Sequence, residues 1–229
     1  MIIRVIIPAY NEELSIGKVI QEIPKDLVKE VIVCNNNSSD QTEKEANNAG
    51  VTVLNEPLMG YGYACLRGIQ YINQNYPETD IVVFLDGDYS DYPEQMVEVV
   101  RPILEEDMDL VIGSRALGNQ EEGSMTIPQR FGNWLSGKLL KWIYKANFTD
   151  LGPFRAIKLS SLNKIQMQDK TYGWTVEMQV KVAQHKMKFC EVPVDYKKRI
   201  GVSKVSGTVK GAFMAGIKIL YTIMKYARK

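Results

Sequence analysis

The chain has few of the residues that build disulfide frameworks, zinc sites or histidine-dependent catalysis. Its cysteines, Cys34, Cys65 and Cys190, are scattered and never spaced as C-x-x-C, so neither a disulfide scaffold nor a structural zinc site is supported. The single histidine, His185, has no nucleophile motif beside it, so a Ser-His-Asp or Cys-His mechanism is not indicated. We expect free thiols in a reducing compartment.

An excess of charge and long apolar runs are also missing. The net charge of +1 provides no overall field that would attract nucleic acid, and no nucleic-acid partner is predicted. No apolar run reaches the roughly 18 residues that a membrane-spanning helix needs. The apolar amino terminus, residues 1–8, lacks a cleavage site and is predicted to be a strand, not a signal peptide. The protein is therefore expected in the cytoplasm.

Short apolar, β-branched runs recur through the first half and are separated by polar stretches of helical length. This alternation is typical of β-α units, whose parallel strands are buried on both faces. The predicted strands are residues 3–7, 31–34, 51–54, 81–85 and 110–112. We predict an α/β fold with a doubly wound, mostly parallel sheet, in which ligands bind beyond the carboxyl ends of the strands. A hydroxyl cap at 38–39 and a proline at position 93 mark two helix starts.

The second half of the chain lacks this regular alternation of strands and helices. A polar, glycine-bearing stretch at 118–124 is predicted to be a mobile loop. The predictions that follow it are a helix at 130–144, an irregular stretch at 150–155, a helix at 175–186 and a strand at 189–194. Residues 1–206 are predicted to form one domain, and 207–229 a helical extension that belongs to the same unit.

Two aspartates separated by one glycine follow the fourth predicted strand. Asp86 and Asp88 would place paired oxygen ligands where the sheet opens to its ligand. Mg²⁺ and Mn²⁺ prefer such oxygens and commonly complete their shell with diphosphate and water. The alternative is a solvated loop in which Asp88 or Asp91 caps the next helix.

Two further segments suit phosphate groups. Gly60 and Gly62 permit a tight turn and a close backbone approach before a predicted helix, although a plain turn explains them equally well. The basic stretch 197–206 combines a guanidinium, ammonium groups and hydroxyls, and a solvated basic turn is its alternative. Arg115 and Arg130 bracket the predicted loop and would either extend this positive surface or pair with nearby carboxylates.

These segments together resemble a known family. The residues Pro8-Ala-Tyr-Asn-Glu12, the turn at 35–40, the glycine turn at 60–68 and Asp86-Gly-Asp88 resemble the family-two glycosyltransferases of type A, Rossmann-like fold. The resemblance is closer to the branch of polyprenyl- and dolichyl-phosphate sugar transferases. It covers nearly the whole chain, because segments at 113–115, 149–155, 172–179, 191–193 and 199–206 also fit that branch in order.

The resemblance implies transfer of a hexose from a nucleotide-sugar donor, with inversion at the anomeric carbon and with Mg²⁺ or Mn²⁺ as cofactor. It assigns the metal to Asp86 and Asp88, and catalytic roles to Asp88, Glu177 and Arg199. The residues implied to bind the nucleotide are Pro8, Ala9, Tyr10, Glu12, Asn36, Gly62 and Asp86. Those implied to bind donor or acceptor phosphates are Arg115, Arg130, Arg199, Ser203 and Lys204.

Three positions depart from the family pattern. Relatives usually carry acidic residues where this chain has Asn35 and Asn36, which alters the expected contact with the base and leaves UDP, GDP and dTDP open. Ser90 stands where relatives often have a longer side chain that supports the metal. We expect metal coordination to be less complete there and to include water.

The acceptor decides whether a general base is needed. A lipid phosphate is mostly dianionic at pH 7 and attacks without one, whereas a hydroxyl needs a base, for which Glu177 is the candidate. With a phosphate acceptor, Glu177 is expected to have a structural or acceptor-positioning role. The polyprenyl-phosphate transferase is the leading hypothesis. A soluble transferase acting on a sugar or protein hydroxyl, a nucleotidyltransferase and a non-catalytic nucleotide-sugar binding protein are the alternatives.

Residues 207–229 bear on that choice. Apolar side chains recur there at helical spacing among lysines and an arginine, which suits a helix at an anionic membrane interface. An amphipathic helix packed on the domain, or on a second subunit of a homodimer, explains the same pattern. Peripheral contact with the inner face of the membrane therefore stays an open alternative.

Overall fold

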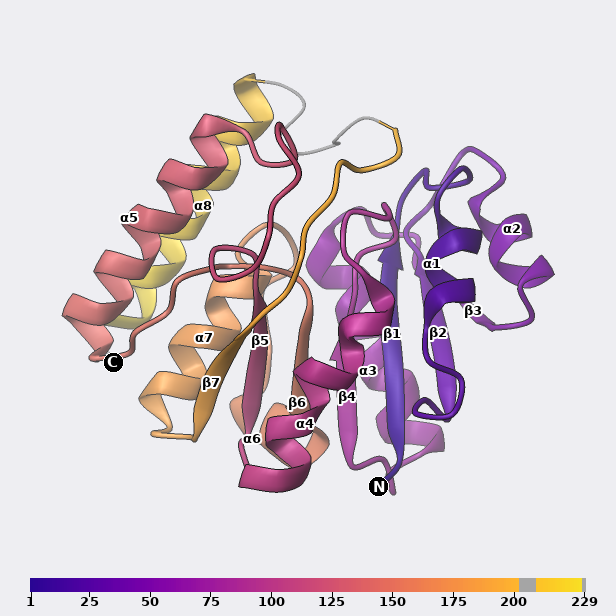
Figure 1. Ribbon diagram of the computed structural model, residues 1–229, viewed down its shortest axis with the longest axis horizontal. Helices are drawn as coiled ribbons and strands as arrows, with labels where there is room; N and C mark the ends of the chain where they lie inside the picture. The colour runs from indigo at the N-terminus through magenta and orange to yellow at the C-terminus, as the bar shows by residue number, and fades with distance from the viewer. Residues whose placement is uncertain (202–208, 228–229) are drawn as a thin grey trace.

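The computed structural model describes residues 1–201 and 209–227. Within them, seven strands form one sheet in the order β3-β2-β1-β4-β6-β5-β7 (Figure 1). The strands are β1 (Ile3–Ala9), β2 (Glu30–Asn35), β3 (Thr52–Asn55), β4 (Ile81–Phe84), β5 (Leu110–Ser114), β6 (Arg155–Lys158) and β7 (Phe189–Pro193). The helices are α1 (Ile16–Glu22), α2 (Thr42–Asn48), α3 (Tyr61–Asn75), α4 (Met96–Glu106), α5 (Ile127–Tyr144), α6 (Leu159–Ile165), α7 (Trp174–Gln184) and α8 (Val209–Ala227).

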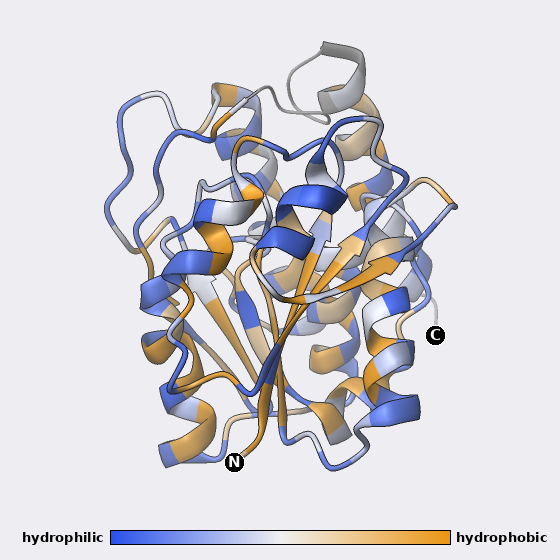
Figure 2. Ribbon diagram, turned by 90° about the vertical axis from the view of Figure 1, so that its right-hand side faces the viewer, coloured by the Kyte–Doolittle hydropathy of each residue, from blue (hydrophilic) through white to orange (hydrophobic). Residues whose placement is uncertain are grey.

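Alternating strand residues feed two hydrophobic clusters, one on each face of the sheet. In β1, Ile3, Val5 and Ile7 pack with α1, α2 and α4, whereas Ile6 packs with α3 on the other face. Helices α5 to α8 also contribute to that second cluster. The strands are apolar along most of their length, while polar residues lie on the outer sides of the helices (Figure 2). This three-layer arrangement confirms the predicted α/β class.

The strand pairing creates a reversal point in the sheet. β1 pairs in parallel with β2 on one side and with β4 on the other, so the carboxyl ends of all three lie at one edge. Most pairs are parallel, as predicted; the exceptions are the two pairs made by β6, which runs antiparallel between β4 and β5. Its first residue, Arg155, therefore pairs with Phe84 at the ligand edge. The open crevice of such sheets lies at that edge.

The predictions for individual elements are largely confirmed. All five predicted strands and the later strand are present, as are the predicted helices at α5 and α7. Pro93 opens a short 3-10 turn (Pro93–Gln95) that leads into α4. The prediction of an irregular stretch at 150–155 missed two elements: Arg155 begins β6, and α6 follows directly.

The predicted hydroxyl cap at residues 38–39 is wrong. α2 begins at Thr42, and the Asp40 carboxylate accepts a hydrogen bond from the Thr42 N–H at 2.9 Å. The Ser38 hydroxyl instead accepts from the Asn11 N–H at 3.0 Å, which ties this turn to the end of β1. A true capping box occurs at Thr126, where α5 begins.

α8 packs beside α5 at one end of the molecule (Figure 1). Its Ile223 and Tyr226 are buried in the cluster that also holds α7. The Tyr144 hydroxyl donates to the Ile223 carbonyl at 2.5 Å, and the Gln184 amide donates to the Tyr226 carbonyl at 2.7 Å. Among residues 1–201 and 209–227, no helix has the length and hydropathy needed to cross a membrane.

Candidate active site

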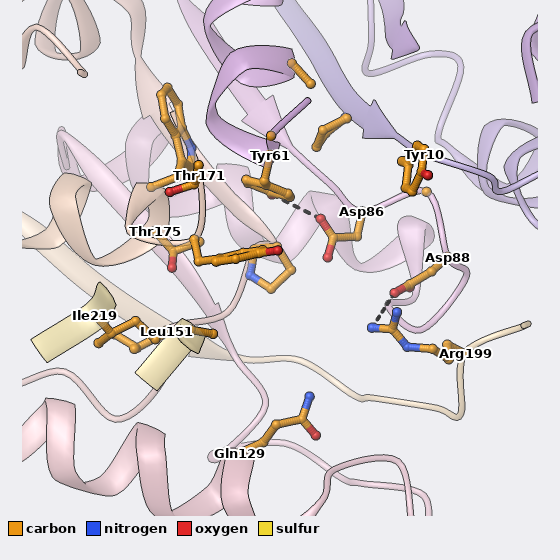
Figure 3. Close-up of a pocket in the computed structure, with 18 of the residues that line it drawn as sticks. Tyr10, Tyr61, Asp86, Asp88, Gln129, Leu151, Thr171, Thr175, Arg199 and Ile219 are labelled. Atoms are coloured by element: carbon orange, nitrogen blue, oxygen red, sulfur yellow. Dashed lines mark hydrogen bonds and ion pairs between the residues drawn. The ribbon is translucent and has the colours of Figure 1, made fainter. Parts of the chain in front are cut away.

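A cavity of about 520 Å³ opens at the carboxyl ends of β1 and β4 (Figure 3). It contains most of the residues that the sequence assigned to nucleotide, metal and phosphate. Those that line it are Pro8, Ala9, Tyr10, Glu12, Asn36, Asp86, Asp88, Arg115 and Arg199. Segments that are far apart in the sequence therefore converge on one site, as expected for the reversal point of a doubly wound sheet.

Asp86 lies just beyond β4 and faces the cavity. The Tyr61 hydroxyl, at the start of α3, donates to its Oδ1 at 3.0 Å. Burial, and next the charge of Asp88, raise the pKa of Asp86 to about 7, although Arg199 opposes the shift. Two carboxylates are thus held close together in a buried position, an arrangement that a cation stabilises.

Asp88 is almost fully buried, and both of its oxygens have partners. Oδ1 accepts from the Ser90 N–H at 2.9 Å and from the Ser90 hydroxyl. Oδ2 lies 2.7 Å from the Arg199 guanidinium (Figure 3). Asp88 therefore closes a local turn with Ser90 and does not cap a helix, so the alternative reading of Asp88 is wrong.

Asp91 is a buried carboxyl group without a hydrogen-bond partner among the described residues. Both of its oxygens are shielded from solvent, and the next helical turn has no side-chain cap. The capping role considered for Asp91 is therefore also wrong. Burial, and next the charge of Asp86, raise its pKa well above the usual value. The acidic segment thus holds a third carboxyl group, and its burial favours the neutral form.

The chemistry of Asp86 and Asp88 fits a hard dication. Carboxylate oxygens are the ligands that Mg²⁺ and Mn²⁺ prefer, and a bound cation would offset both the burial and the repulsion from Asp88 that raise the pKa of Asp86. No cluster of three or more His, Cys, Asp or Glu side chains suited to a metal occurs in the part of the chain that the structure describes. A cation here would take its other ligands from a diphosphate and water.

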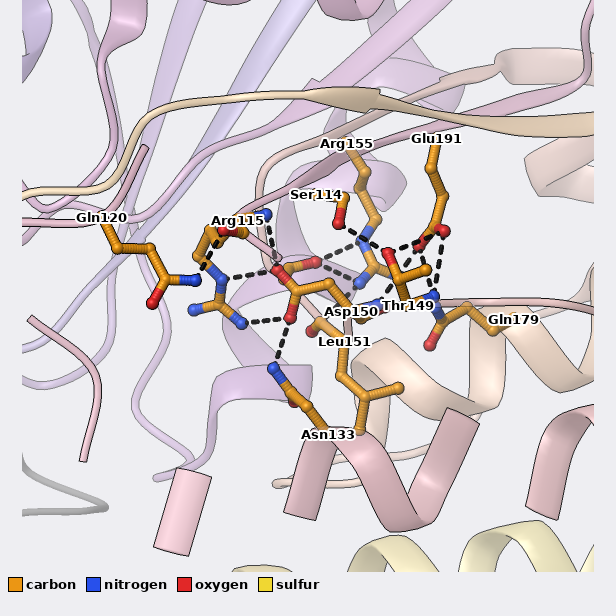
Figure 4. Close-up of polar contacts among 11 residues, drawn as sticks. Ser114, Arg115, Gln120, Asn133, Thr149, Asp150, Leu151, Arg155, Gln179 and Glu191 are labelled. Carbon is orange, nitrogen blue, oxygen red and sulfur yellow. Dashed lines mark hydrogen bonds and ion pairs between the residues drawn. The ribbon is translucent and has the colours of Figure 1, made fainter. Parts of the chain in front are cut away.

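Arg115 reaches the cavity but is committed to a buried ion pair. Its Nε and Nη2 lie 2.7 Å from the two oxygens of Asp150, and the Asp150 carboxylate also accepts from the Asn133 amide at 2.6 Å (Figure 4). Burial opposes the charged guanidinium, but Asp150 outweighs it and raises the pKa of Arg115. The guanidinium also lies 4.9 Å from the ring centre of Tyr196. This pair joins the end of β5 to the loop at 149–152, and Asn133 connects α5 to the same carboxylate.

Glu191 and Arg155 hold the loop that carries Asp150. The Glu191 carboxylate accepts from the Thr149 and Asp150 N–H groups (Figure 4). Arg155 is fully buried and donates to the backbone carbonyls of Gly152 and Thr175. The loop at 149–152 is therefore fixed from both sides, and Leu151 and Pro153 form part of the cavity wall.

Asn36 lines the cavity, but its amide is used inside the protein. Nδ2 donates to the carbonyls of Glu56 and Leu58, and Oδ1 accepts from the Gly60 N–H at 2.8 Å. An acidic residue has no N–H with which to satisfy those carbonyls. The departure from the acidic family pattern thus has a structural reason: the amide braces the turn at 56–60.

Gly62 and Glu177 lie elsewhere than the sequence suggested. A Cβ on Gly62 would lie 2.1 Å from the Asp169 carbonyl oxygen, so Gly62 permits close packing, and Gly60 lines the cavity instead. Glu177 is fully buried and accepts from the N–H groups of 168 and 169 and from the Tyr226 hydroxyl. It stabilises that loop together with Lys181, at 2.8 Å, so its assignment as a base at the cavity is wrong.

Arg130 is exposed on α5 and lines a second cavity, away from the carboxylate pair. Ser203 and Lys204 lie outside the described residues. The sequence reasoning missed several wall residues: Tyr61, Tyr172, Trp174, Tyr196, Ala215, Gly216 and Ile219. Tyr61 sits inside the glycine turn that was noted, so its position offered a signal, whereas the α8 residues required knowledge of where that helix packs.

Comparison with known proteins places this site in a family. The chain matches the profile of Glycosyl transferase family 2 over residues 4–166. An undecaprenyl-phosphate mannosyltransferase of Micrococcus luteus is 27% identical over 233 residues, covering 95% of this chain and 93% of that protein. A dolichyl-phosphate hexose transferase of Haloferax volcanii is 27% identical over 214 residues, covering 92% and 89%.

A solved structure agrees in fold. The glucosyl-3-phosphoglycerate synthase of Mycobacterium tuberculosis, crystallised with Mn²⁺, UDP and glucosyl-3-phosphoglycerate, has a TM-score of 0.77 at 22% identity, over 99% of this chain and 80% of that one. The shared fold is the type A glycosyltransferase fold that the motifs predicted. Together with the profile match over residues 4–166, it shows that the chain belongs to Glycosyl transferase family 2.

Proposed function

We propose that this protein is a metal-dependent, inverting hexosyltransferase that moves a sugar from a nucleotide donor to a polyprenyl, dolichyl-type phosphate. One observation carries the proposal. The cavity joins the carboxylate pair of Asp86 and Asp88 to an apolar wall from α8, made by Ala215, Gly216 and Ile219. In Figure 3, Leu151 and Ile219 lie on the opposite side of the cavity from Asp88 and Arg199. A polar donor end thus faces an apolar acceptor end.

The donor end has the charges that the reaction needs. Cleaving the anomeric bond builds negative charge on the departing diphosphate and positive charge on the sugar ring. Asp86 and Asp88 would hold Mg²⁺ or Mn²⁺, which supplies Lewis-acid stabilisation of the diphosphate. Arg199 is within reach of the same oxygens because it already lies against Asp88. The residues from Pro8 to Glu12, with Asn36, would surround the nucleotide.

The acceptor end favours a phosphate over a hydroxyl. Among the described residues, the carboxylates that line the cavity are Glu12, Asp86 and Asp88, all assigned to the donor. With Glu177 buried, no described carboxylate is left to deprotonate a hydroxyl. A phosphate dianion attacks without a base. The two polyprenyl-type transferases among the relatives support the same acceptor class.

We further propose that residues 1–206 and 207–229 act as one unit, in which α8 brings the acceptor end to the inner face of a membrane. The contacts of Ile223 and Tyr226 with α5 and α7 support the first part. The apolar α8 wall supports the second. A homodimer that covers α8 is the competing arrangement.

The proposal can be tested by incubating the purified protein and Mn²⁺ with radiolabelled nucleotide hexoses. Each assay uses one donor, with a single base and a single sugar. Each donor is paired with a polyprenyl phosphate in detergent, with phosphoglycerate and with a simple sugar. Label that enters the organic phase, and that Asp88→Asn abolishes, supports the proposal. Label found only in an aqueous transfer product would overturn the lipid-phosphate acceptor, and release of hexose 1-phosphate would indicate nucleotidyl transfer instead.

A further inference from the structure

A second cavity, of about 440 Å³, lies beside the first along α5. Met125 and Asn133 line both cavities, so the two are neighbours. Its walls are α5, the segment after β5 and residues 147–149. A Cβ on Gly137 would lie 2.5 Å from the Phe148 carbonyl oxygen, so α5 packs directly against that last segment. The proposed sugar transfer does not use this space.

The charges around this cavity are all positive. Arg130, Lys138 and Lys141 line it, and no lining residue is acidic. They lie on neighbouring turns of one helix face, because their spacing of eight and three residues returns to the same side. Among the described residues, no carboxylate forms an ion pair with any of the three. The sequence of α5 contains no aspartate or glutamate at all. Such a site suits an anion with several acceptor oxygens.

The surroundings indicate which anion. Trp134 also lines the cavity and is 57% exposed, and Phe131 and Trp142 on the same helix are 59% and 73% exposed. Aromatic rings interleaved with lysines are typical of a surface that lies at the boundary between lipid headgroups and acyl chains. α8, which packs beside α5, exposes Phe213 and Ile217 and also has no acidic residue. A free phosphate would not need these aromatic neighbours.

We propose that the second cavity binds the phosphate of an anionic membrane phospholipid and thereby holds α5 against the bilayer. Arg130, Lys138 and Lys141 surround the phosphate oxygens, and Trp134 lies beside the glycerol region. The site is separate from catalysis: it sets the position of the protein on the membrane, with the mouth of the first cavity beside α8. It goes beyond the proposed transferase function and does not depend on it.

The test compares binding of the full chain to phosphatidylcholine vesicles with and without phosphatidylglycerol. Lys138→Gln/Lys141→Gln removes two cations from the cavity. Lys25→Gln/Lys29→Gln removes the same charge from the exposed loop between α1 and β2 and serves as the control. We expect binding to anionic vesicles to weaken on the order of tenfold or more for the first pair only. Equal loss in both pairs would mean a diffuse charge effect and would overturn the site.

Four further readouts test the proposal. Brominated lipid chains should quench the fluorescence of the wild type more than that of Trp134→Phe. Saturation by inorganic phosphate without vesicle binding would overturn the lipid source, and so would equal binding to neutral vesicles. A dimer seen by light scattering and lost in Trp134→Ser would assign the face to a second copy instead. Transfer to a detergent-dispersed acceptor should be unchanged in Lys138→Gln/Lys141→Gln, which separates this site from the proposed function.

Discussion

The Arg199 guanidinium lies 2.7 Å from the Asp88 carboxylate, on the oxygen that Ser90 leaves open. In the ligand-free protein, the side chain that we propose binds the diphosphate therefore neutralises a proposed metal ligand. A dication at Asp88 would compete with Arg199 for the same oxygen, whereas a bound diphosphate would offer Arg199 a new partner. The nucleotide and the metal should consequently bind with positive coupling.

Arg199→Gln tests this competition. We expect the variant to bind Mn²⁺ alone more tightly, by about ten- to a hundredfold, because a charge-assisted contact of about 1.5–3 kcal/mol no longer has to be broken. Binding of a nucleoside diphosphate with Mn²⁺ should weaken, since the diphosphate loses a guanidinium. Electron paramagnetic resonance of free Mn²⁺ measures both quantities. Lys198→Gln, on the adjacent exposed side chain, is the control, and unchanged Mn²⁺ affinity in Arg199→Gln would contradict the competition.

Asp91 should make stability depend on pH. Its pKa is raised by burial well above the unfolded value of 3.8, so the folded state retains a proton that the unfolded state releases. The free energy of unfolding should therefore fall as the pH rises above about 4, and Asp91→Asn should remove this fall. We expect similar stability near pH 4 and an advantage for the variant of about 1–3 kcal/mol near pH 8.

Urea denaturation at each pH measures the effect of Asp91→Asn. Asp26→Asn, on the exposed loop before β2, supplies the comparison and should leave the pH profile unaltered. An Asp91→Asn variant that is less stable than the wild type at pH 8 would show that the carboxylate has a charged partner in the folded protein.

Asn36→Asp should destabilise the turn at 56–60. The carboxylate would face the carbonyls of Glu56 and Leu58 without an N–H to donate, at a cost of about 1–3 kcal/mol. Nucleotide affinity should fall with it, because Gly60 lines the cavity. Asn37→Asp, at the exposed neighbouring position, is the matched change. Thermal unfolding of both variants measures the effect. Equal changes in melting temperature for Asn36→Asp and Asn37→Asp would refute the bracing role.

Glu177→Gln distinguishes a structural role from a catalytic one. Because the carboxylate holds residues 168–169 and Tyr226, we expect lower thermal stability with kcat within a few-fold of the wild type. A small rise in KM is expected, since Thr171 and Tyr172 line the cavity nearby. A general base would instead lower kcat by about 10²–10⁴-fold with stability unchanged.

The predictable parts of the structure were those encoded locally. The buried strands are recognisable in the sequence as continuous apolar runs. An acidic pair that directly follows such a run is expected at the carboxyl-terminal edge of the sheet, where ligands bind. β6 was not predicted from the sequence because it has only four residues and begins with a charged side chain, Arg155. Its strand conformation depends on pairing with β4 and β5, which are distant in sequence.

Side-chain partners were the least predictable feature of the site. Arg115 lines the cavity, where its predicted contact with a phosphate would place it. Its pairing with Asp150, however, depends on how the loop at 149–152 folds back. Glu177 follows Gly173 and Trp174 near the site, yet the direction of α7 turns it inward. Position along the chain indicates which edge of the sheet a residue approaches, and only packing determines what it touches there.

The placement of β6 affects the order in which the sheet can be completed. In the described structure β5 pairs with β6 and β7 and has no ladder with β4. A ribosome that has released residues 1–115 has thus produced a strand with no neighbour to join. The four strands β3-β2-β1-β4 already pair with one another at that point, but β5 can join them only after about forty more residues have supplied β6, which lies between β4 and β5.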